Sequence, residues 1–183
     1  MRSLFPALAA SFLALAPIAA YAADAKPAPK PAVAAPAAGP KALGIVKAWS
    51  AYATGEKKTL VCYLVGHPTK SVPARKALSG SVTHRPGDNA VNVVNFTLGY
   101  VAKPGAPAEI DIDGKKYSLF TNKDAAWAPD AATDKAITVA LSKGKVALVK
   151  ATPEKGATSI DTYPLDGFGQ ALTLIDKNCG VKR

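Results

Sequence analysis

The sequence predicts a mainly β fold, an antiparallel β-sandwich or curled barrel with two short helices in the carboxyl-terminal half. Short runs of alternating apolar and polar residues, separated by turn-forming residues, fill the middle of the chain. Between two of these runs lies Asp113-Gly114, a dipeptide typical of a tight β-hairpin. The stretches with helical spacing come late and do not alternate with the strands, which argues against a parallel α/β sheet.

The strands are expected in consecutive antiparallel pairs joined by turns rich in Gly, Pro, Asp and Lys. In the longest run, residues 90–100, the alternate positions from Asn92 to Tyr100 form the more apolar face and therefore the expected core side. The expected strands cover residues 46–53, 60–65, 81–84, 90–100, 109–112, 115–120, 145–151 and 158–163.

Two segments have the spacing of short helices. The first covers residues 134–143 and is followed by Gly144, a residue that favours a helix end. The second covers residues 166–177 and places apolar residues at positions i, i+4 and i+7. These apolar residues are Phe168, Leu172 and Ile175.

The 183 residues suffice for about one domain, preceded by two segments of different composition. Residues 1–22 have a basic start, an apolar run and the sequence Ala20-Tyr21-Ala22, the pattern of a cleavable signal peptide. Residues 23–41 hold five prolines among alanines and lysines and predict a disordered linker. A single β-rich domain is expected over residues 42–183, with no transmembrane segment after cleavage.

The chain is strongly basic, with 23 Lys and Arg against 13 Asp and Glu. From Ala42 onward the counts are 19 and 12, so the expected domain itself carries about seven excess positive charges. Such a surface favours anionic partners, for example lipopolysaccharide phosphates, acidic polysaccharides or host glycosaminoglycans. Nucleic acid is not expected as a partner, because the chain leaves the cytoplasm. The candidate contacts for an anionic partner are Lys57, Lys58, Arg85, Lys115 and Lys116.

Two cysteines, Cys62 and Cys179, are present in a chain expected to enter an oxidising compartment. An even cysteine count in an exported chain indicates a disulfide, here between the first predicted hairpin and the last helix. The alternative is a reactive thiol at Cys62 with His67 as its base. Residues five apart on a strand point to opposite faces and lie about 16 Å apart, which disfavours that alternative.

Other chemistry has little support in the sequence. Glu109, Asp111 and Asp113 share one strand face, where they could bind Ca²⁺ or act as an acid and base, although such a stripe is more often solvated. The two histidines, His67 and His84, have no acidic partner at a metal-ligand spacing. Nucleotide-binding loops and a Gly-x-Ser-x-Gly motif are absent. We therefore expect no catalytic residue, no metal site and no cofactor.

The end of the sequence, residues 159–172 continuing to Cys179, resembles the closing motif of the invasion-associated locus B family, a group of exported alphaproteobacterial proteins. Blocks upstream resemble the same family in the same order, and the resemblance covers about 48–181. These blocks are residues 49–52, 62–65, 82–86, 112–121 and 125–128. The resemblance implies a β-rich envelope or secreted protein, whose family takes its name from host-cell entry, and it implies no catalytic activity.

These observations together predict a non-enzymatic binding protein of the bacterial envelope. The expected location is the periplasm, with attachment to the outer surface or secretion as alternatives. Its expected partners are anionic envelope or host glycans, or another envelope protein, and it could contribute to host-cell invasion. One alternative is a hydrolase of envelope glycans that uses Asp111, Asp113 and His84. The other is a periplasmic chaperone or inhibitor, which would need an exposed apolar groove or edge strand.

The signal-peptide pattern predicts that the exported protein begins at Ala23, because small residues occupy both recognition positions before it. Mass spectrometry of the periplasmic fraction should find this amino terminus. A membrane-embedded form that retains Met1 would contradict the prediction.

Overall fold

A computed structural model describes residues 39–183, so the expected signal peptide and nearly all of the expected linker lie outside the described residues. Eleven strands, two α-helices and two short 3-10 helices make up this part of the chain. The strands are β1 (Lys41–Val46), β2 (Trp49–Thr54), β3 (Val61–Gly66), β4 (Lys70–Val72), β5 (Ser79–Arg85), β6 (Ala90–Thr97), β7 (Ala108–Ile112), β8 (Lys115–Asn122), β9 (Ala125–Trp127), β10 (Val146–Ala151) and β11 (Ser159–Pro164). The helices are η1 (Lys57–Thr59), η2 (Pro86–Asp88), α1 (Ala131–Lys143) and α2 (Phe168–Cys179).

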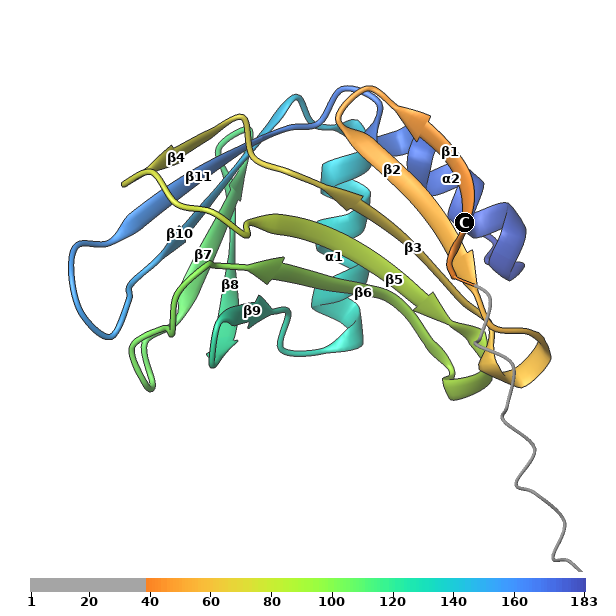
Figure 1. Ribbon diagram of the computed structural model, residues 1–183, viewed down its shortest axis with the longest axis horizontal. Helices are drawn as coiled ribbons and strands as arrows, with labels where there is room; N and C mark the ends of the chain where they lie inside the picture. Colours follow the sequence, from red (N-terminus) through yellow and green to blue (C-terminus); the bar gives the residue numbers. More distant parts are fainter. Residues whose placement is uncertain (1–38) are drawn as a thin grey trace, which may run out of the picture. The chain divides into compact units, whose positions relative to one another are not determined.

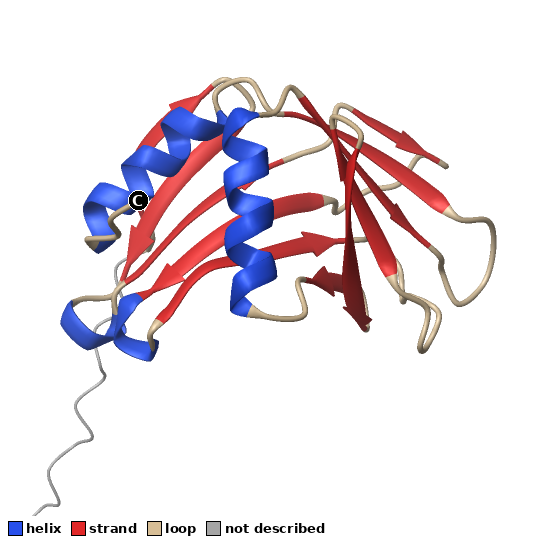
Figure 2. Cartoon of the chain, turned by 180° about the vertical axis from the view of Figure 1, so that it is seen from behind, coloured by secondary structure: helices blue, strands red, loops and turns tan. Residues whose placement is uncertain are grey.

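All eleven described strands belong to one antiparallel sheet in the order β1-β2-β3-β5-β6-β9-β8-β7-β10-β11-β4. The sheet curls on itself without closing. Phe96 of β6 and Tyr163 of β11 show the curl, because four strands lie between them in the sheet while their ring centroids are 5.4 Å apart. Both α-helices lie behind the strands in Figure 1 and in front of them in Figure 2. The helices thus cover the inner side of the curl and leave the outer face of the sheet uncovered.

The core lies inside the curl, where alternate strand residues meet the two helices. Trp49 is 2% exposed, and its ring lies edge-on to that of Phe168 with centroids 4.8 Å apart. Its indole N–H donates to the Pro164 carbonyl at 2.9 Å. Gly66 makes room for this ring, since a Cβ there would lie 2.6 Å from it. These contacts fix the start of α2 against β2 and β3.

The mainly β fold and the two late helices are confirmed, and the curled sheet is the form that the fold takes. The predicted core face of β6 is confirmed as well, because Asn92, Val94, Phe96 and Leu98 are all buried. The region 46–53 is not one strand. Lys47 takes a left-handed conformation with φ of 55°, which turns the chain between β1 and β2.

Three further elements differ from the sequence expectation. Strands β4 and β9 were not predicted, since each has only three residues. Strand β4 pairs with the distant strand β11, and β9 lies between its sequence neighbour β8 and the more distant β6. Helix α1 begins at Ala131, three residues earlier than expected. Asp130 caps it by accepting a hydrogen bond from the Thr133 amide at 2.7 Å, which stabilises the additional turn.

A disulfide joins Cys62 of β3 to Cys179 at the end of α2, with their Cα atoms 6.0 Å apart. The predicted pairing is therefore confirmed, and no free cysteine occurs among residues 39–183. Because Cys62 is in the disulfide, it has no free thiol and cannot act as the nucleophile of the alternative interpretation. Within the same described range, no helix is both long and apolar enough to cross a membrane.

Replacing both cysteines by alanine should lower the free energy of unfolding by about 4 kcal/mol, because the bridge closes a loop with a sequence separation of 117. Urea unfolding of the wild type and the double variant measures the difference. A difference below about 1 kcal/mol would show that the bridge does not hold α2 in place.

Candidate binding surface

The five predicted anion contacts fall into two separate groups. Lys57 and Lys58 lie on η1, between β2 and β3, and Arg85 is the last residue of β5, directly before η2. The two short helices touch so closely that a Cβ at Gly87 would collide with the Lys58 carbonyl. Lys115 and its neighbour Lys116 lie instead at the start of β8, in the other half of the sheet.

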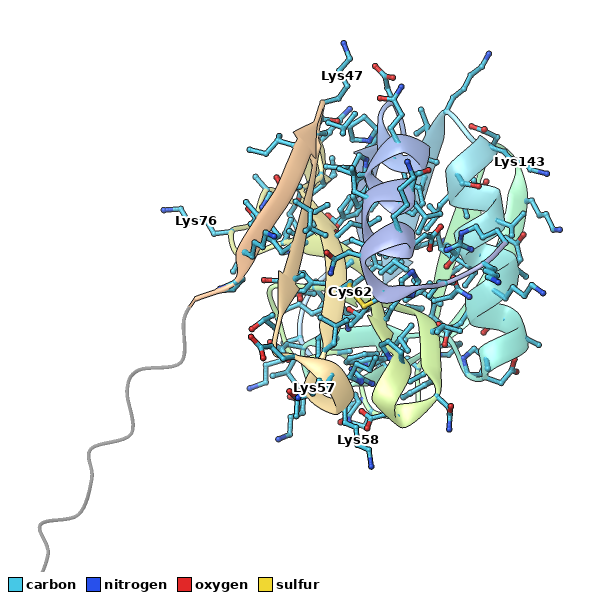
Figure 3. The ribbon with its side chains drawn as sticks, turned by 90° about the vertical axis from the view of Figure 1, so that its right-hand side faces the viewer. Lys47, Lys57, Lys58, Cys62, Lys76 and Lys143 are labelled. Atoms are coloured by element: carbon cyan, nitrogen blue, oxygen red, sulfur yellow. A yellow bond between two sulfur atoms is a disulfide. The ribbon has the colours of Figure 1, made fainter. Side chains whose placement is uncertain are left out.

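Carboxylates compensate two of these five cations. The Lys116 Nζ lies 2.9 Å from a Glu109 carboxylate oxygen, and this hydrogen bond raises the pKa of Lys116. The Arg85 Nε lies 3.4 Å from Asp88. Within the described residues, Lys57 and Lys58 form no ion pair, and Figure 3 shows both pointing away from the body of the domain. Lys115 also forms no ion pair in this part of the chain, but its Nζ lies 5.2 Å from the centre of the Tyr117 ring. The η1 lysines are thus the adjacent pair that is free of both kinds of contact.

Residues 57–87 contain six Lys and Arg and no Asp or Glu. Three of these cations are on η1 and directly before η2, as described above. The other three, Lys70, Arg75 and Lys76, lie in the connection between β3 and β5, at the opposite ends of these strands. This second group is not among the predicted contacts, although the acid-free stretch is visible in the sequence. Cations thus flank β3 and β5 at both ends.

The connection between β3 and β5 surrounds a hollow of about 370 Å³, lined by residues that include His67, Lys70 and Arg75. The His67 Nδ1 lies 2.7 Å from the Leu78 carbonyl oxygen, which can only accept. The imidazole therefore donates from Nδ1. Its Nε2 is left for solvent or a ligand.

Arg75 fastens this connection to the sheet. Its guanidinium donates to both Asp161 carboxylate oxygens, at 2.7 and 2.6 Å, and to the Leu98 carbonyl at 3.1 Å. It also lies 4.9 Å from the centre of the Tyr100 ring. Asp161 is 1% exposed, and this burial raises its pKa although Arg75 acts in the opposite direction. Arg75 therefore stabilises the fold and is not available for a partner, whereas Lys70 and Lys76 are exposed.

Apart from Arg85 at the end of β5, the outer side of β2, β3, β5 and β6 carries no charged side chain between the two basic ends. We call this surface the neutral face. Its twelve outward-facing, partly exposed residues are Ser50, Tyr52, Thr54, Val61, Tyr63, Val65, Ser79, Ser81, Thr83, Val93, Asn95 and Thr97. The rings of Tyr52 and Tyr63 stack on it, with centroids 5.4 Å apart and planes at 27°. The outer side of β7, β8 and β10, in contrast, carries both acidic and basic residues.

The acidic stripe considered for catalysis supports the β7–β8 hairpin. Asp111 accepts a hydrogen bond from the Gly114 amide at 2.7 Å, which stabilises the turn. Asp113 accepts from the amides of Lys145 and Val146 at 2.8 and 3.1 Å, and so holds the start of β10. Within residues 39–183, no group of three His, Cys, Asp or Glu side chains is placed to hold a metal ion.

His84 is fully buried in a polar cluster beside the disulfide. Its Nδ1 accepts from the Asn92 amide at 2.9 Å, so Nε2 carries the hydrogen and donates to Asp176 at 2.9 Å. Arg183 completes the cluster by donating to Asp176 at 2.6 and 2.9 Å and to the Asn92 side chain at 2.8 Å. Burial lowers the pKa of His84. The cluster links β5 and β6 to the end of α2.

The comparisons with known proteins agree with this architecture. The family model described as Invasion associated locus B (IalB) protein matches residues 49–176. The crystal structure of invasion associated protein B from Bartonella henselae is similar with a TM-score of 0.53 and 20% sequence identity. The similarity covers 74% of this chain and 96% of the Bartonella chain, and at this identity it shows the fold alone. No curated protein matches the chain.

The His84 cluster predicts that the protein loses stability as the pH falls from 7.5 to 5.5. In the unfolded protein, His84 takes up a proton near its ordinary pKa of 6.5. In the folded protein its pKa is lower, so the same proton is taken up only at lower pH. Urea unfolding should show stability that rises with pH in this range, with a slope below the limit of about 1.4 kcal/mol per pH unit for one proton. His84→Gln should flatten the slope. Equal slopes in wild type and His84→Gln would contradict the assignment.

Proposed function

Since this chain belongs to the invasion associated locus B family, we propose that it is an exported envelope protein that acts by binding an anionic glycan. The proposed location is the periplasm or the outer surface, and the proposed role includes contact with host cells. The disulfide supports this location, because such bonds persist in oxidising compartments. The signal-peptide pattern of residues 1–22 supports export as well.

One observation carries the proposal: the acid-free segment 57–87 places cations at both ends of β3 and β5. Strand β5 has seven residues, so the two basic ends are separated by roughly 20 Å. A polyanion with repeated charges can contact both ends at once, whereas a small anion can contact only one. Lipopolysaccharide phosphates, acidic polysaccharides and glycosaminoglycans all carry such repeated charges.

The two alternative functions have unequal support. For a glycan hydrolase, Asp111 and Asp113 are already engaged in the hairpin, and His84 is buried with Asp176 as its partner. For a chaperone or inhibitor, edge strand β1 is the relevant feature, since Ile45 on it is 73% exposed. A partner strand could pair with this edge. Anionic glycan binding remains the better supported function, because it uses the whole basic segment.

Charge reversal tests the proposal. Binding to heparin should weaken steeply between 50 and 500 mM salt, because the Debye length falls from about 14 to about 4 Å. The double variants Lys57→Glu/Lys58→Glu and Lys70→Glu/Lys76→Glu should each weaken binding at 50 mM salt. Both should unfold within about 0.5 kcal/mol of the wild type, since these lysines are exposed. Isothermal titration calorimetry and urea unfolding supply the two measurements.

Lys135→Glu/Lys143→Glu is the matched control, with the same charge change on exposed residues of α1. This control should bind heparin more tightly than the other two variants. Equally weakened heparin binding in all three double variants would show that binding depends on net charge alone. Salt-insensitive binding, or cleavage of the glycan that Asp111→Asn abolishes, would overturn the proposal.

A further inference from the structure

We propose that the neutral face, extended by Trp127 and Phe120, is a platform for the uncharged sugar rings of the glycan, while the flanking cations bind its acidic groups. This inference rests on the proposed function and names the chemistry between the two basic ends. The occupant is an extended oligosaccharide whose pyranose rings lie flat on the outer face of the sheet.

The strand register arranges the platform in two rows that cross the strands. The first row runs through Tyr52, Tyr63, Thr83 and Val93 on β2, β3, β5 and β6. The second row runs through Ser50, Val65, Ser81, Asn95, Trp127 and Phe120, and so continues onto β9 and β8. Aromatic rings therefore lie at both sides of the platform, with hydroxyl and amide groups between them.

This mixture matches the two sides of a sugar. A pyranose ring presents an apolar face of C–H groups, which can stack on tyrosine and tryptophan rings. Its edge presents hydroxyl groups, for which Ser81, Thr83 and Asn95 offer donors and acceptors. Phe120 is 49% exposed and lengthens the apolar part of the second row. The platform thus supplies both kinds of contact without any ionic group.

Asn95, in the second row, has an unpaired side-chain N–H group. Its side-chain Nδ2 is buried and has no hydrogen-bond partner among the described residues. In the register, Asn95 lies between Ser81 and Trp127, near the centre of the second row. An unpaired amide group destabilises the folded protein. A sugar hydroxyl above this row would give the amide its partner once the side chain turns outward.

The other half of the same sheet shows that the absence of charge is particular to this face. On β7 and β8 the outer side carries the ion pair between Glu109 and Lys116, and β10 adds Lys150. These side chains would lose hydration beneath a ligand, which costs free energy. A ligand on the neutral face would cover no charged side chain, so this cost does not arise there. Its convex form also suits an extended chain that lies across it, since the apolar concave side is filled by the core.

Tryptophan fluorescence tests the platform directly, because Trp49 is buried in the core and Trp127 is on the outer face. The probes are a heparin oligosaccharide and chitohexaose, an uncharged N-acetylglucosamine oligomer, each at 50 and 500 mM salt. Both probes should shift the emission of Trp127, and Trp127→Phe should remove the shift. Chitohexaose binding should be equal at the two salt concentrations.

Substitutions distinguish the contribution of the platform to binding from that of the cations. Tyr63→Ser and Trp127→Ala should each weaken chitohexaose binding at least tenfold. Ile160→Ser, at an exposed apolar residue of β11 on the other half of the sheet, should not. Lys57→Glu/Lys58→Glu should weaken heparin binding and leave chitohexaose binding unchanged. Far-ultraviolet circular dichroism checks that each variant is folded.

The outcomes distinguish this inference from the proposed function. Salt-sensitive heparin binding with no change at Trp127, and no binding of chitohexaose, would overturn the platform and leave anionic glycan binding intact. Chitohexaose binding without heparin binding would overturn the proposed function and support the platform. A concentration-dependent dimer that Trp127→Ala dissociates would show that a second copy occupies the face, which would also overturn the platform.

Discussion

The attachment of α2 to the inner side of the sheet is the constraint on which the rest of the structure depends. Three interactions provide it: the disulfide from Cys62 to Cys179, the edge-on contact of Trp49 with Phe168, and the polar cluster around His84. They act at both ends of the helix and on its buried side. With α2 held there, the first three strands bend around it and turn their outer side to solvent, as Figures 1 and 2 show.

This arrangement separates the side chains that maintain the fold from those that remain available for binding. Buried polar groups are used inside: His84 and Asp176 bond each other, and Asp161 holds Arg75. Asp134 of α1 accepts a hydrogen bond from the Val94 amide of β6 at 2.8 Å, and burial raises its pKa. The outer side of β2, β3, β5 and β6 keeps hydroxyls and aromatic rings, with exposed lysines beyond the ends of β3 and β5. These groups can contact a partner by charge, stacking and hydrogen bonding.

The sequence could predict the features that depend on local patterns. The alternation along β6 and the Asp113-Gly114 turn, whose two residues have φ of 49° and 91°, follow from strand and turn preferences. The turn at Lys47 could not be predicted, because lysine has no preference for the left-handed conformation found there. The three-residue strand β4 exists only through its long-range pairing with β11, and β9 is too short to have a strand pattern of its own.

The candidate binding surface likewise has some features that the sequence predicts and others that depend on the folded sheet. Lys57 and Lys58 could be selected from the sequence, because a basic turn is a local feature. The contact of η1 with η2, and the neutral face between the basic ends, result from pairing among four strands. Arg75 and Asp161 are 86 positions apart, so no spacing rule could pair them. The register that brings Asn95 beside Trp127 is likewise a property of the folded sheet.

In the proposed complex, a glycan binds the outer side of the first sheet half and the basic groups at its ends. Chemical-shift mapping of backbone amides during titration with a heparin oligosaccharide locates the bound glycan on the domain. We expect perturbations concentrated in η1, β3, the connection of residues 67–78 and β5, with α1, β7 and β10 unaffected. Perturbations centred on α1, or on the hairpin that carries Lys115 and Lys116, would contradict this placement.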